Sequence, residues 1–244
     1  MERHYKTIPY YQEDGNTHFG TSTAQIFYSQ FGEDLEIYTC LIHPFLDHYK
    51  ENQGIYVEVG AGDGVKYSNT KFFEDELNFT GILIEPGPST HQLLKKTRPN
   101  NRLFDCAIID GYDDIDFLIR GELDDGFVSG IPQFMPEALK QGFHKHSSTI
   151  KVPARPLRDL TSDCNIDRID FLSIDVEGAE HEVLKSMDWT LPIYIVAVEL
   201  DDEGIDDKAS HQLLLQHGFV FLKKVGLSKI YFDPYFFKKL HLKH

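Results

Sequence analysis

The sequence lacks the features of a secreted or membrane-spanning protein. Its opening residues contain no apolar stretch of the kind that a secretory signal peptide requires, and no run approaches the roughly 20 apolar residues that cross a membrane. Only three cysteines occur in 244 residues, Cys40, Cys106 and Cys164, and no two of them form a CxxC pair. That pattern predicts no disulfide framework. We therefore expect a cytoplasmic protein with reduced thiols and without a membrane span.

Positive charge is also scarce. The chain has 24 Lys and Arg against 39 Asp and Glu, which gives a formal net charge of -15. A protein that binds nucleic acid through its phosphates needs a basic face, so we expect no nucleic-acid partner. The apolar content of 41% is typical of a globular protein with a sizeable core, and the length fits one large domain or two small ones.

Short apolar runs alternate with segments of helical character from Ile55 onward. We expect strands at 55–60, 82–86, 102–109, 170–175, 193–200, 219–226 and 228–234, and helices at 68–78, 89–99, 177–189 and 206–218. Ser68 or Asn69 is expected to cap the first of these helices, and Ser89 the second. The alternation predicts an α/β fold with a mostly parallel, Rossmann-like sheet and helices on both faces. The short connection between the last two strands predicts an antiparallel hairpin at the edge of that sheet.

Two segments fall outside this pattern. Residues 1–27 are polar and aromatic with weak periodicity, and we expect them to form an N-terminal arm. Residues 112–153 contain many Gly, Pro and Asp residues, and we expect a loop-like insert there. The rest of the chain, from 28 to 244, is then expected to be a single domain around one sheet.

The stretch "YVEVGAGDG", from Tyr56 to Gly64, follows the first expected strand. Its three alternating glycines let the backbone approach a ligand without Cβ clashes. Glu85 ends the second strand, where a carboxylate can accept hydrogen bonds from the hydroxyls of a ribose. A glycine turn followed by an acid at the next strand end is typical of a site for an adenosine-containing cofactor.

Two cofactor classes fit such a turn. A dinucleotide fingerprint has a third glycine where this chain has Val65. The acids Glu58 and Asp63 would also lie unfavourably beside a diphosphate. They suit a ligand that carries an amino group and a sulfonium, so S-adenosylmethionine is expected rather than NAD.

Several segments resemble the FkbM-type S-adenosylmethionine-dependent methyltransferases. They are "SQFGED" (29–34), "VEVGAGDG" with "SNT" after it, "GILIEPGP", the arginine and proline at 98–99, and "DFLSIDVEGAEHEVLKS". The resemblance implies a seven-stranded methyltransferase sheet and methyl transfer to oxygen, often to a sugar hydroxyl. It also implies a set of cofactor-binding residues: Gln30, Gly32, Glu58, Gly60, Ala61, Gly62, Asp63, Glu85, Asp105, Cys106 and Ala107.

Four acids lie at or just after the ends of the fourth and fifth expected strands. Asp175 and Glu199 end these neighbouring strands, and Glu177 and Glu180 come in the turn after Asp175. Such a cluster can raise one pKa to make a base, or it can bind a divalent cation through oxygen. A neutral alcohol needs a base or a metal to lose its proton. We expect Asp175 and Glu199 to form the catalytic pair, with Glu177 and Glu180 either supporting it or only capping the helix.

The sequence leaves two alternatives open, one on the presence of a metal ion and one on the type of activity. A metal-independent base is favoured over Mg²⁺ or Mn²⁺ held by Asp175 and Glu199. An O-methyltransferase that acts on a small molecule or glycan is favoured over an NAD(P)-dependent oxidoreductase of Rossmann type and over a catalytically silent binding protein. The arm and the insert are expected to select the acceptor. The insert's Phe127, Phe134 and Phe143 would either face a sugar or pack onto the sheet.

Overall fold

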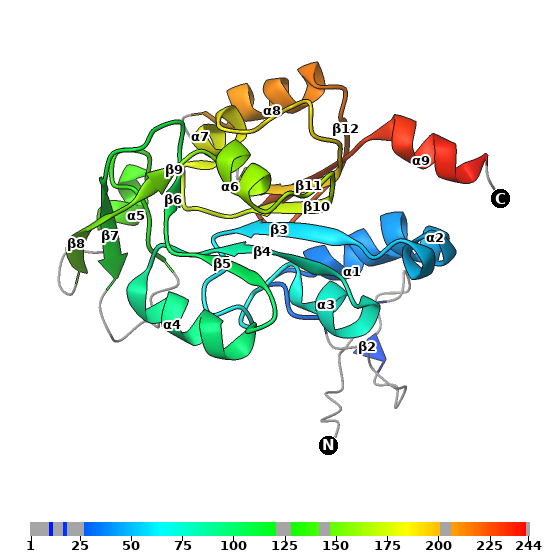
Figure 1. Cartoon of the computed structure of the whole chain (residues 1–244), viewed down its shortest axis with the longest axis horizontal. Coiled ribbons are helices and arrows are strands. Elements are labelled where there is room, and N and C mark those ends of the chain that lie inside the picture. Colours follow the sequence, from blue (N-terminus) through cyan, green and yellow to red (C-terminus); the bar gives the residue numbers. More distant parts are fainter. Residues whose placement is uncertain are drawn as a thin grey trace.

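A central seven-stranded sheet organises the chain (Figure 1). The computed structural model describes residues 10–11, 17–18, 27–120, 128–141, 147–200 and 206–242, so most of the predicted N-terminal arm lies outside the described residues. The strand order is β12-β13-β11-β10-β3-β4-β5. The strands are β3 (Ile55–Val59), β4 (Thr80–Ile84), β5 (Arg102–Phe104), β10 (Ile169–Ile174), β11 (Ile193–Glu199), β12 (Val220–Val225) and β13 (Ser228–Phe232). The predicted mostly parallel α/β sheet is confirmed.

Helices cover both faces of this sheet (Figure 1). One face carries α6 (Leu157–Asp163), α7 (Glu180–Lys185) and α8 (Asp207–Gln216). The other face carries α1 (Glu33–Ile37), α2 (Leu46–Glu51), α3 (Lys71–Leu77) and α9 (Pro234–His241), with a π-helical turn (Tyr38–Ile42) and a 3-10 turn (His43–Phe45) after α1. Helix α4 (Pro88–Thr97) lies beside β4 and β5.

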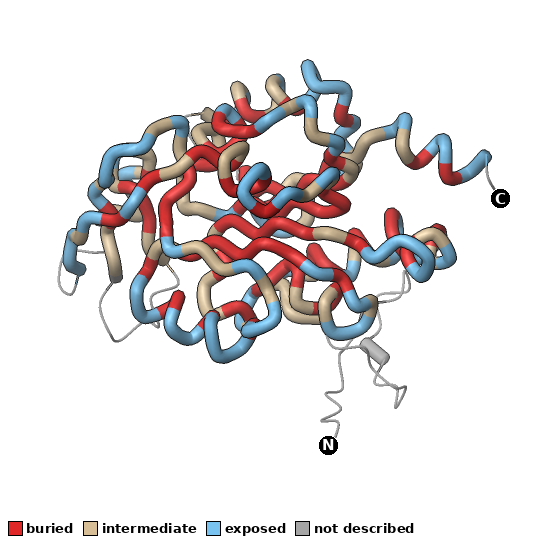
Figure 2. Tube along the Cα trace, in the orientation of Figure 1, coloured by how far each residue is buried: buried red, intermediate tan, exposed pale blue. Residues whose placement is uncertain are grey.

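Two apolar cores lie on the two sides of the sheet, and the central strands β3, β4, β10 and β11 are buried along most of their length (Figure 2). In β3, Val57 and Val59 pack into the core that includes Leu160 of α6, whereas Tyr56 packs into the core that includes Phe72 of α3. This is the period of two that an extended strand imposes on its side chains. Because helices cover both faces of the sheet, these central strands appear as nearly continuous apolar runs in the sequence.

The closing hairpin lies at the edge of the sheet, as predicted. Strands β12 and β13 pair antiparallel, as expected, and β13 also pairs antiparallel with β11. The second strand of the hairpin therefore lies between β11 and β12, and β12 forms the edge. Strand β13 is therefore antiparallel to both of its neighbours, one position in from the edge.

The predicted loop between residues 112 and 153 was wrong in part, since regular structure occurs within it. Strand β7 (Ile115–Arg120) pairs antiparallel with β8 (Ser147–Val152), and α5 spans Glu137–Gln141. The expected strand at 102–109 divides into β5 and a short strand β6 (Ala107–Ile108), which pairs with β9 (Ala154–Arg155). The apolar alternation of Ile115, Phe117 and Ile119 is the signal for β7. Phe134 packs against an apolar cluster of the insert, whereas Phe127 and Phe143 lie outside the described residues.

Helix boundaries show where capping signals matter. Helix α3 begins at Lys71, whose backbone N–H donates to Ser68 Oγ at 3.1 Å. Helix α4 begins at Pro88 rather than after Ser89, because the fixed φ of proline suits the first helical position. Helix α9 was not predicted, although Asp233 Oδ1 accepts a hydrogen bond from the Tyr235 N–H at 2.8 Å and Pro234 follows it. In the part of the chain that the structure describes, no helix is long and apolar enough to cross a membrane.

Candidate active site

Four adjacent strands end at the same level of the sheet. Val59 of β3 pairs with Ile84 of β4 and with Ile174 of β10, and Ile174 pairs with Val198 of β11. The residues that follow these positions are Gly60, Glu85, Asp175 and Glu199. The carboxyl edge of an open parallel sheet is where ligands bind, and the register places these predicted residues together there.

A cavity of about 180 Å³ opens at this edge. Nine of the predicted site residues line it: Gln30, Gly60, Ala61, Gly62, Glu85, Cys106, Ala107, Asp175 and Glu177. The other six lie outside its lining, although they belong to the same loops and strand ends: Gly32, Glu58, Asp63, Asp105, Glu180 and Glu199. The cavity therefore runs from the segment before α1, past the glycine turn, to the start of β6.

The glycine turn is fixed by its contacts with two neighbouring strands. Gly60 has a φ of +88°, and a Cβ on it would overlap the carbonyl oxygen of Asp175. The N–H groups of Gly60 and Ala61 both donate to the Ile84 carbonyl at 3.0 Å. Glycine is required at this position because the backbones of β3 and β10 meet there without room for a side chain.

Glu85 forms the wall of the cavity next to this turn. It is only 7% exposed, and burial raises the pKa of its carboxyl, against the lowering effect of its hydrogen bonds. Its oxygens accept from Gly62 N at 2.9 Å, Gly87 N at 2.7 Å and Thr90 Oγ1 at 2.8 Å. A carboxylate has about four acceptor positions, so three are used within the chain and one is left for a ligand hydroxyl.

Glu58 and Asp63 direct their carboxylates into the loop instead of the cavity. Glu58 is buried and accepts from Ser68 Oγ at 2.9 Å, Asn69 N at 2.8 Å and Thr70 Oγ1 at 2.7 Å. Asp63 Oδ1 accepts from the N–H groups of Val65 and Lys66, both at 2.8 Å. In this structure both acids hold the chain between the glycine turn and α3.

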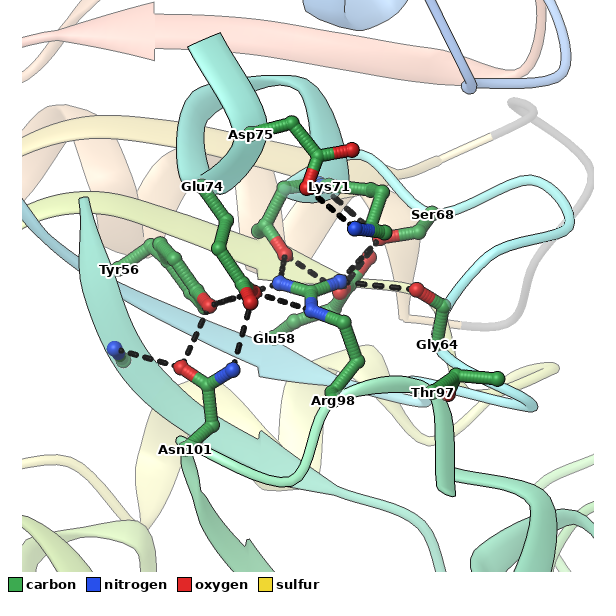
Figure 3. Close-up of polar contacts among 12 residues, drawn as sticks. Tyr56, Glu58, Gly64, Ser68, Lys71, Glu74, Asp75, Thr97, Arg98 and Asn101 are labelled. Carbon is green, nitrogen blue, oxygen red and sulfur yellow. Dashed lines mark hydrogen bonds and ion pairs between the residues drawn. The ribbon is translucent and has the colours of Figure 1, made fainter. Parts of the chain in front are cut away.

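Arg98 connects that loop to the sheet (Figure 3). Its side chain is fully buried, and its Nη1 donates to the Gly64 carbonyl at 2.9 Å. Nη2 donates to the Tyr56 hydroxyl at 2.7 Å, and Nε forms an ion pair with Glu74 of α3. One guanidinium thus holds the end of the glycine turn, a strand and a helix in one arrangement.

Asp175 and Glu199 meet at the strand ends as the sequence predicted. Burial raises the pKa of Glu199 far above its usual range, and the charge of Asp175 and a hydrogen bond with Asp175 raise it further. The neutral form of Glu199 is therefore favoured beside Asp175. Asp175 itself is exposed at the cavity wall, so this carboxylate is open to a ligand.

Glu177 lies in the turn after Asp175 and lines the same cavity. Its φ of +58° is in the left-handed region, which residues with a Cβ adopt only uncommonly. Burial raises its pKa to about 8, and the charges of Asp175 and Glu180 contribute to this rise. A neutral Glu177 can donate a hydrogen bond as well as accept one.

Glu180 stabilises this turn from the start of α7. Its Oε1 accepts from Val176 N at 3.0 Å and from Gly178 N at 3.1 Å. Burial raises its pKa to about 7, although its hydrogen bonds with backbone N–H groups oppose the rise. Gly178 has a φ of +111°, and a Cβ on it would overlap the Phe134 carbonyl oxygen. The insert therefore packs directly against the acidic turn.

Sequence reasoning missed part of the cavity wall. Lys66, Tyr67 and Ser68, after the glycine turn, and Phe117 and Ile131, in the insert, line it as well. Tyr67 has a φ of +63°, which the sequence does not reveal, whereas the alternation around Phe117 could have been recognised. Among the described residues, no group of three or more His, Cys, Asp or Glu side chains is arranged to hold a metal ion.

The family model described as the methyltransferase FkbM domain matches residues 58–221, which include this turn, the acids and most of the sheet. The chain belongs to the FkbM methyltransferase family. The predicted resemblance is thereby confirmed, and with it the membership of a methyltransferase family. A search of curated proteins gives no match.

Three solved methyltransferases are among the structures similar to this chain. An FkbM methyltransferase from Methylobacillus flagellatus KT is 15% identical, with a TM-score of 0.44, and the match covers 74% of this chain and 43% of that one. The METTL16 MTase domain is 10% identical, with a TM-score of 0.41 and coverage of 80% and 64%. Precorrin-6y C5,15-methyltransferase from Geobacter metallireducens GS-15 is 9% identical, with a TM-score of 0.35 and coverage of 76% and 85%. This chain thus spans less than two thirds of the first two structures.

Proposed function

We propose that this FkbM-family domain transfers the methyl group of S-adenosylmethionine to a hydroxyl group of a small molecule or glycan. The observation that carries the proposal is the Asp175–Glu199 pair, which lies at two neighbouring strand ends beside a cavity formed by a glycine turn and Glu85. Asp175 of this pair is a proton acceptor at the edge of the sheet, and it lines the cavity that a ligand would occupy.

The residues present fit the cofactor. The single acceptor position left on Glu85 suits one ribose hydroxyl, and the backbone of Gly60 to Gly62 leaves room beside it. Gln30 lines the cavity and precedes Phe31, which lies against Gly226 between β12 and β13, next to β11 in the strand order. Cys106 lines the cavity after β5, at the other edge of the sheet, so the methionine end would lie toward Gln30. When bound, S-adenosylmethionine would supply an activated methyl group on a positively charged sulfonium.

Asp175 is the residue that we assign as the general base. Its carboxylate is exposed at the cavity wall, so it can accept a hydrogen bond from an acceptor hydroxyl and take its proton as the oxygen is methylated. Glu199 stays neutral and orients Asp175 through the hydrogen bond between them. Glu177 faces the same cavity and can hold the acceptor through a second hydrogen bond.

A transfer assay tests this proposal. The protein is incubated with S-adenosylmethionine and a panel of glycans and small alcohols, and the products are analysed for the added mass of one methyl group. We expect Asp175→Asn to lower turnover by about 10²–10⁴, the usual contribution of a base, while the Kd for S-adenosylmethionine changes little. Glu199→Gln is expected to lower turnover as well. Glu182→Gln, on the same helix as Glu180 but paired with Lys185 at 2.9 Å, is the control and should keep full turnover.

Two outcomes would overturn the assignment. Near-normal turnover in both Asp175→Asn and Glu199→Gln would exclude the acidic pair. Activity that disappears with EDTA and returns with Mg²⁺ or Mn²⁺ would show that a metal, and not a base alone, activates the hydroxyl. Binding of NAD without any binding of S-adenosylmethionine would exclude methyl transfer itself.

A further inference from the structure

The insert forms one side of the cavity. Phe117 of β7 lines it together with Val128, Ser129 and Ile131 of the segment after β7. Leu118 and Gly130 exchange two backbone hydrogen bonds, of 2.9 Å and 3.1 Å, which hold that segment against β7. Phe117 is only 4% exposed and belongs to the same apolar cluster as Ile131 and Ala107. The wall is therefore supported from behind by packed side chains.

This wall adjoins the segment that follows β5, because Ala107 belongs to the same apolar cluster as Phe117. Cys106, Ala107 and Ile108 follow β5 and line the cavity beside Phe117. Strand β6 pairs with β9, and the Ala107 N–H donates to the Pro153 carbonyl at 2.8 Å, so the insert returns to the sheet at this point. The first part of the insert and the segment after β5 therefore form one continuous apolar surface.

The chemistry of this apolar wall differs from that of the acidic turn around Asp175 and Glu177. Phe117, Ile131, Ile108 and the buried thiol of Cys106, whose pKa burial raises to about 11, offer apolar contact and no formal charge. In the strand order, Glu85 at the end of β4 lies between Cys106, which follows β5, and Asp175, which follows β10. A planar apolar group joined to a ribose is a nucleobase, and aromatic side chains bind nucleobases by stacking or packing on them.

We infer that the insert belongs to the cofactor site, with Phe117 packing against the adenine ring. This inference rests on the proposed function and specifies which part of the chain selects the adenosine half of the cofactor. It differs from the expectation that residues 112–153 select the acceptor. The insert instead joins the adenine wall to the acidic turn, because Gly130 lies beside Glu177 and the Phe134 carbonyl lies against Gly178.

Calorimetric titration of the full chain tests the inference with S-adenosylhomocysteine, adenosine and methionine. We expect Phe117→Ala to weaken S-adenosylhomocysteine and adenosine by about 5- to 150-fold, the range found when a ring stacked on a base is replaced by alanine. Methionine binding should be unchanged. Phe117→Leu keeps apolar volume without the flat ring, and it should lose less affinity than Phe117→Ala.

Ile150→Ala is the matched control. Ile150 is the cross-strand partner of Phe117 and packs against the same cluster, but it does not line the cavity. We expect this variant to bind S-adenosylhomocysteine like the wild type. Equal affinity of Phe117→Ala and the wild type, or an equal loss in Ile150→Ala and Phe117→Ala, would overturn the inference.

Glu85→Ala separates this inference from the proposed function. If the wild type binds S-adenosylhomocysteine and Glu85→Ala loses that affinity while Phe117→Ala keeps it, the insert is excluded from the adenine site and the cofactor assignment stands. If the wild type binds none of the adenosine ligands, the proposed function fails and the inference fails with it.

Discussion

Arg98→Met should destabilise the fold more than any exchange of a surface arginine. The guanidinium is fully buried and bonds to Gly64, Tyr56 and Glu74. Breaking a buried ion pair by removing one partner costs about 3–5 kcal/mol, because the other charge is left without compensation. The Glu74 side chain is 21% exposed, so water can solvate it in part. We therefore expect a loss of about 3 kcal/mol, a large share of the roughly 5–15 kcal/mol that stabilises a domain.

Urea unfolding followed by circular dichroism at pH 7 measures this loss. Arg155→Met is the control, because Arg155 pairs with Asp163 at 2.6 Å on the surface, with 34% and 57% of the two side chains exposed. Such pairs contribute about 0–1 kcal/mol. Arg98→Lys keeps the charge but not the planar set of donors, and it should fall between the wild type and Arg98→Met. A loss below about 1 kcal/mol in Arg98→Met, or equal losses in the two methionine variants, would refute the reasoning.

Two other substitutions test the acidic turn and the glycine turn. The pKa of Glu177 is raised from 4.5 to about 8, so the folded state favours the neutral form of this side chain. The stability that the neutral side chain contributes is fully present below about pH 4.5 and is lost as the pH rises through 8. The loss is at most about 5 kcal/mol, at about 1.4 kcal/mol per pKa unit. Glu177→Gln should therefore show a smaller fall in Tm between pH 5 and pH 9 than the wild type, and equal falls would contradict the assignment. Gly60→Ala should destabilise the protein far more than Gly218→Ala. Both glycines have a φ near +87°, but only a Cβ at Gly60 would overlap a neighbouring backbone. Similar thermal midpoints in the two variants would show that the contact with Asp175 is not tight.

The sequence was sufficient to predict the strand ends of the site, because their positions follow from sheet order. Once β10 and β11 are neighbours, Asp175 and Glu199 must end at the same edge. The direction of the loop carboxylates was not predictable in this way. Glu58 ends up facing Ser68 and Thr70 because the chain folds back after the glycine turn, and that path depends on contacts with Arg98, which is 30 residues away from Ser68 in the sequence.

The insert shows a second limit of sequence patterns. Many Gly, Pro and Asp residues in the insert favoured a loop, although the apolar positions of β7 alternate as in a strand. The partner of β7 is β8, which is formed by residues 147–152, far along the chain. Local propensity could not show that these two segments pair, because long-range pairing depends on the packing of side chains in the cluster around Phe117 and Ile131.

The hydrogen-bond partners of the buried acids divide them by role. The carboxylates of Glu58 and Glu180 accept from nearby backbone N–H groups and, in the case of Glu58, from hydroxyls. These bonds stabilise the loops on either side of the cavity, so replacing either acid would leave several buried donors without a partner. Asp175 and Glu199 instead interact with one another, and burial together with Asp175 raises the pKa of Glu199. A carboxylate that a neighbouring acid orients, and that is exposed at a cavity wall, can exchange protons with a ligand without disrupting the backbone around it. The same edge of the sheet therefore contains acids that maintain the fold and a pair that is available for chemistry.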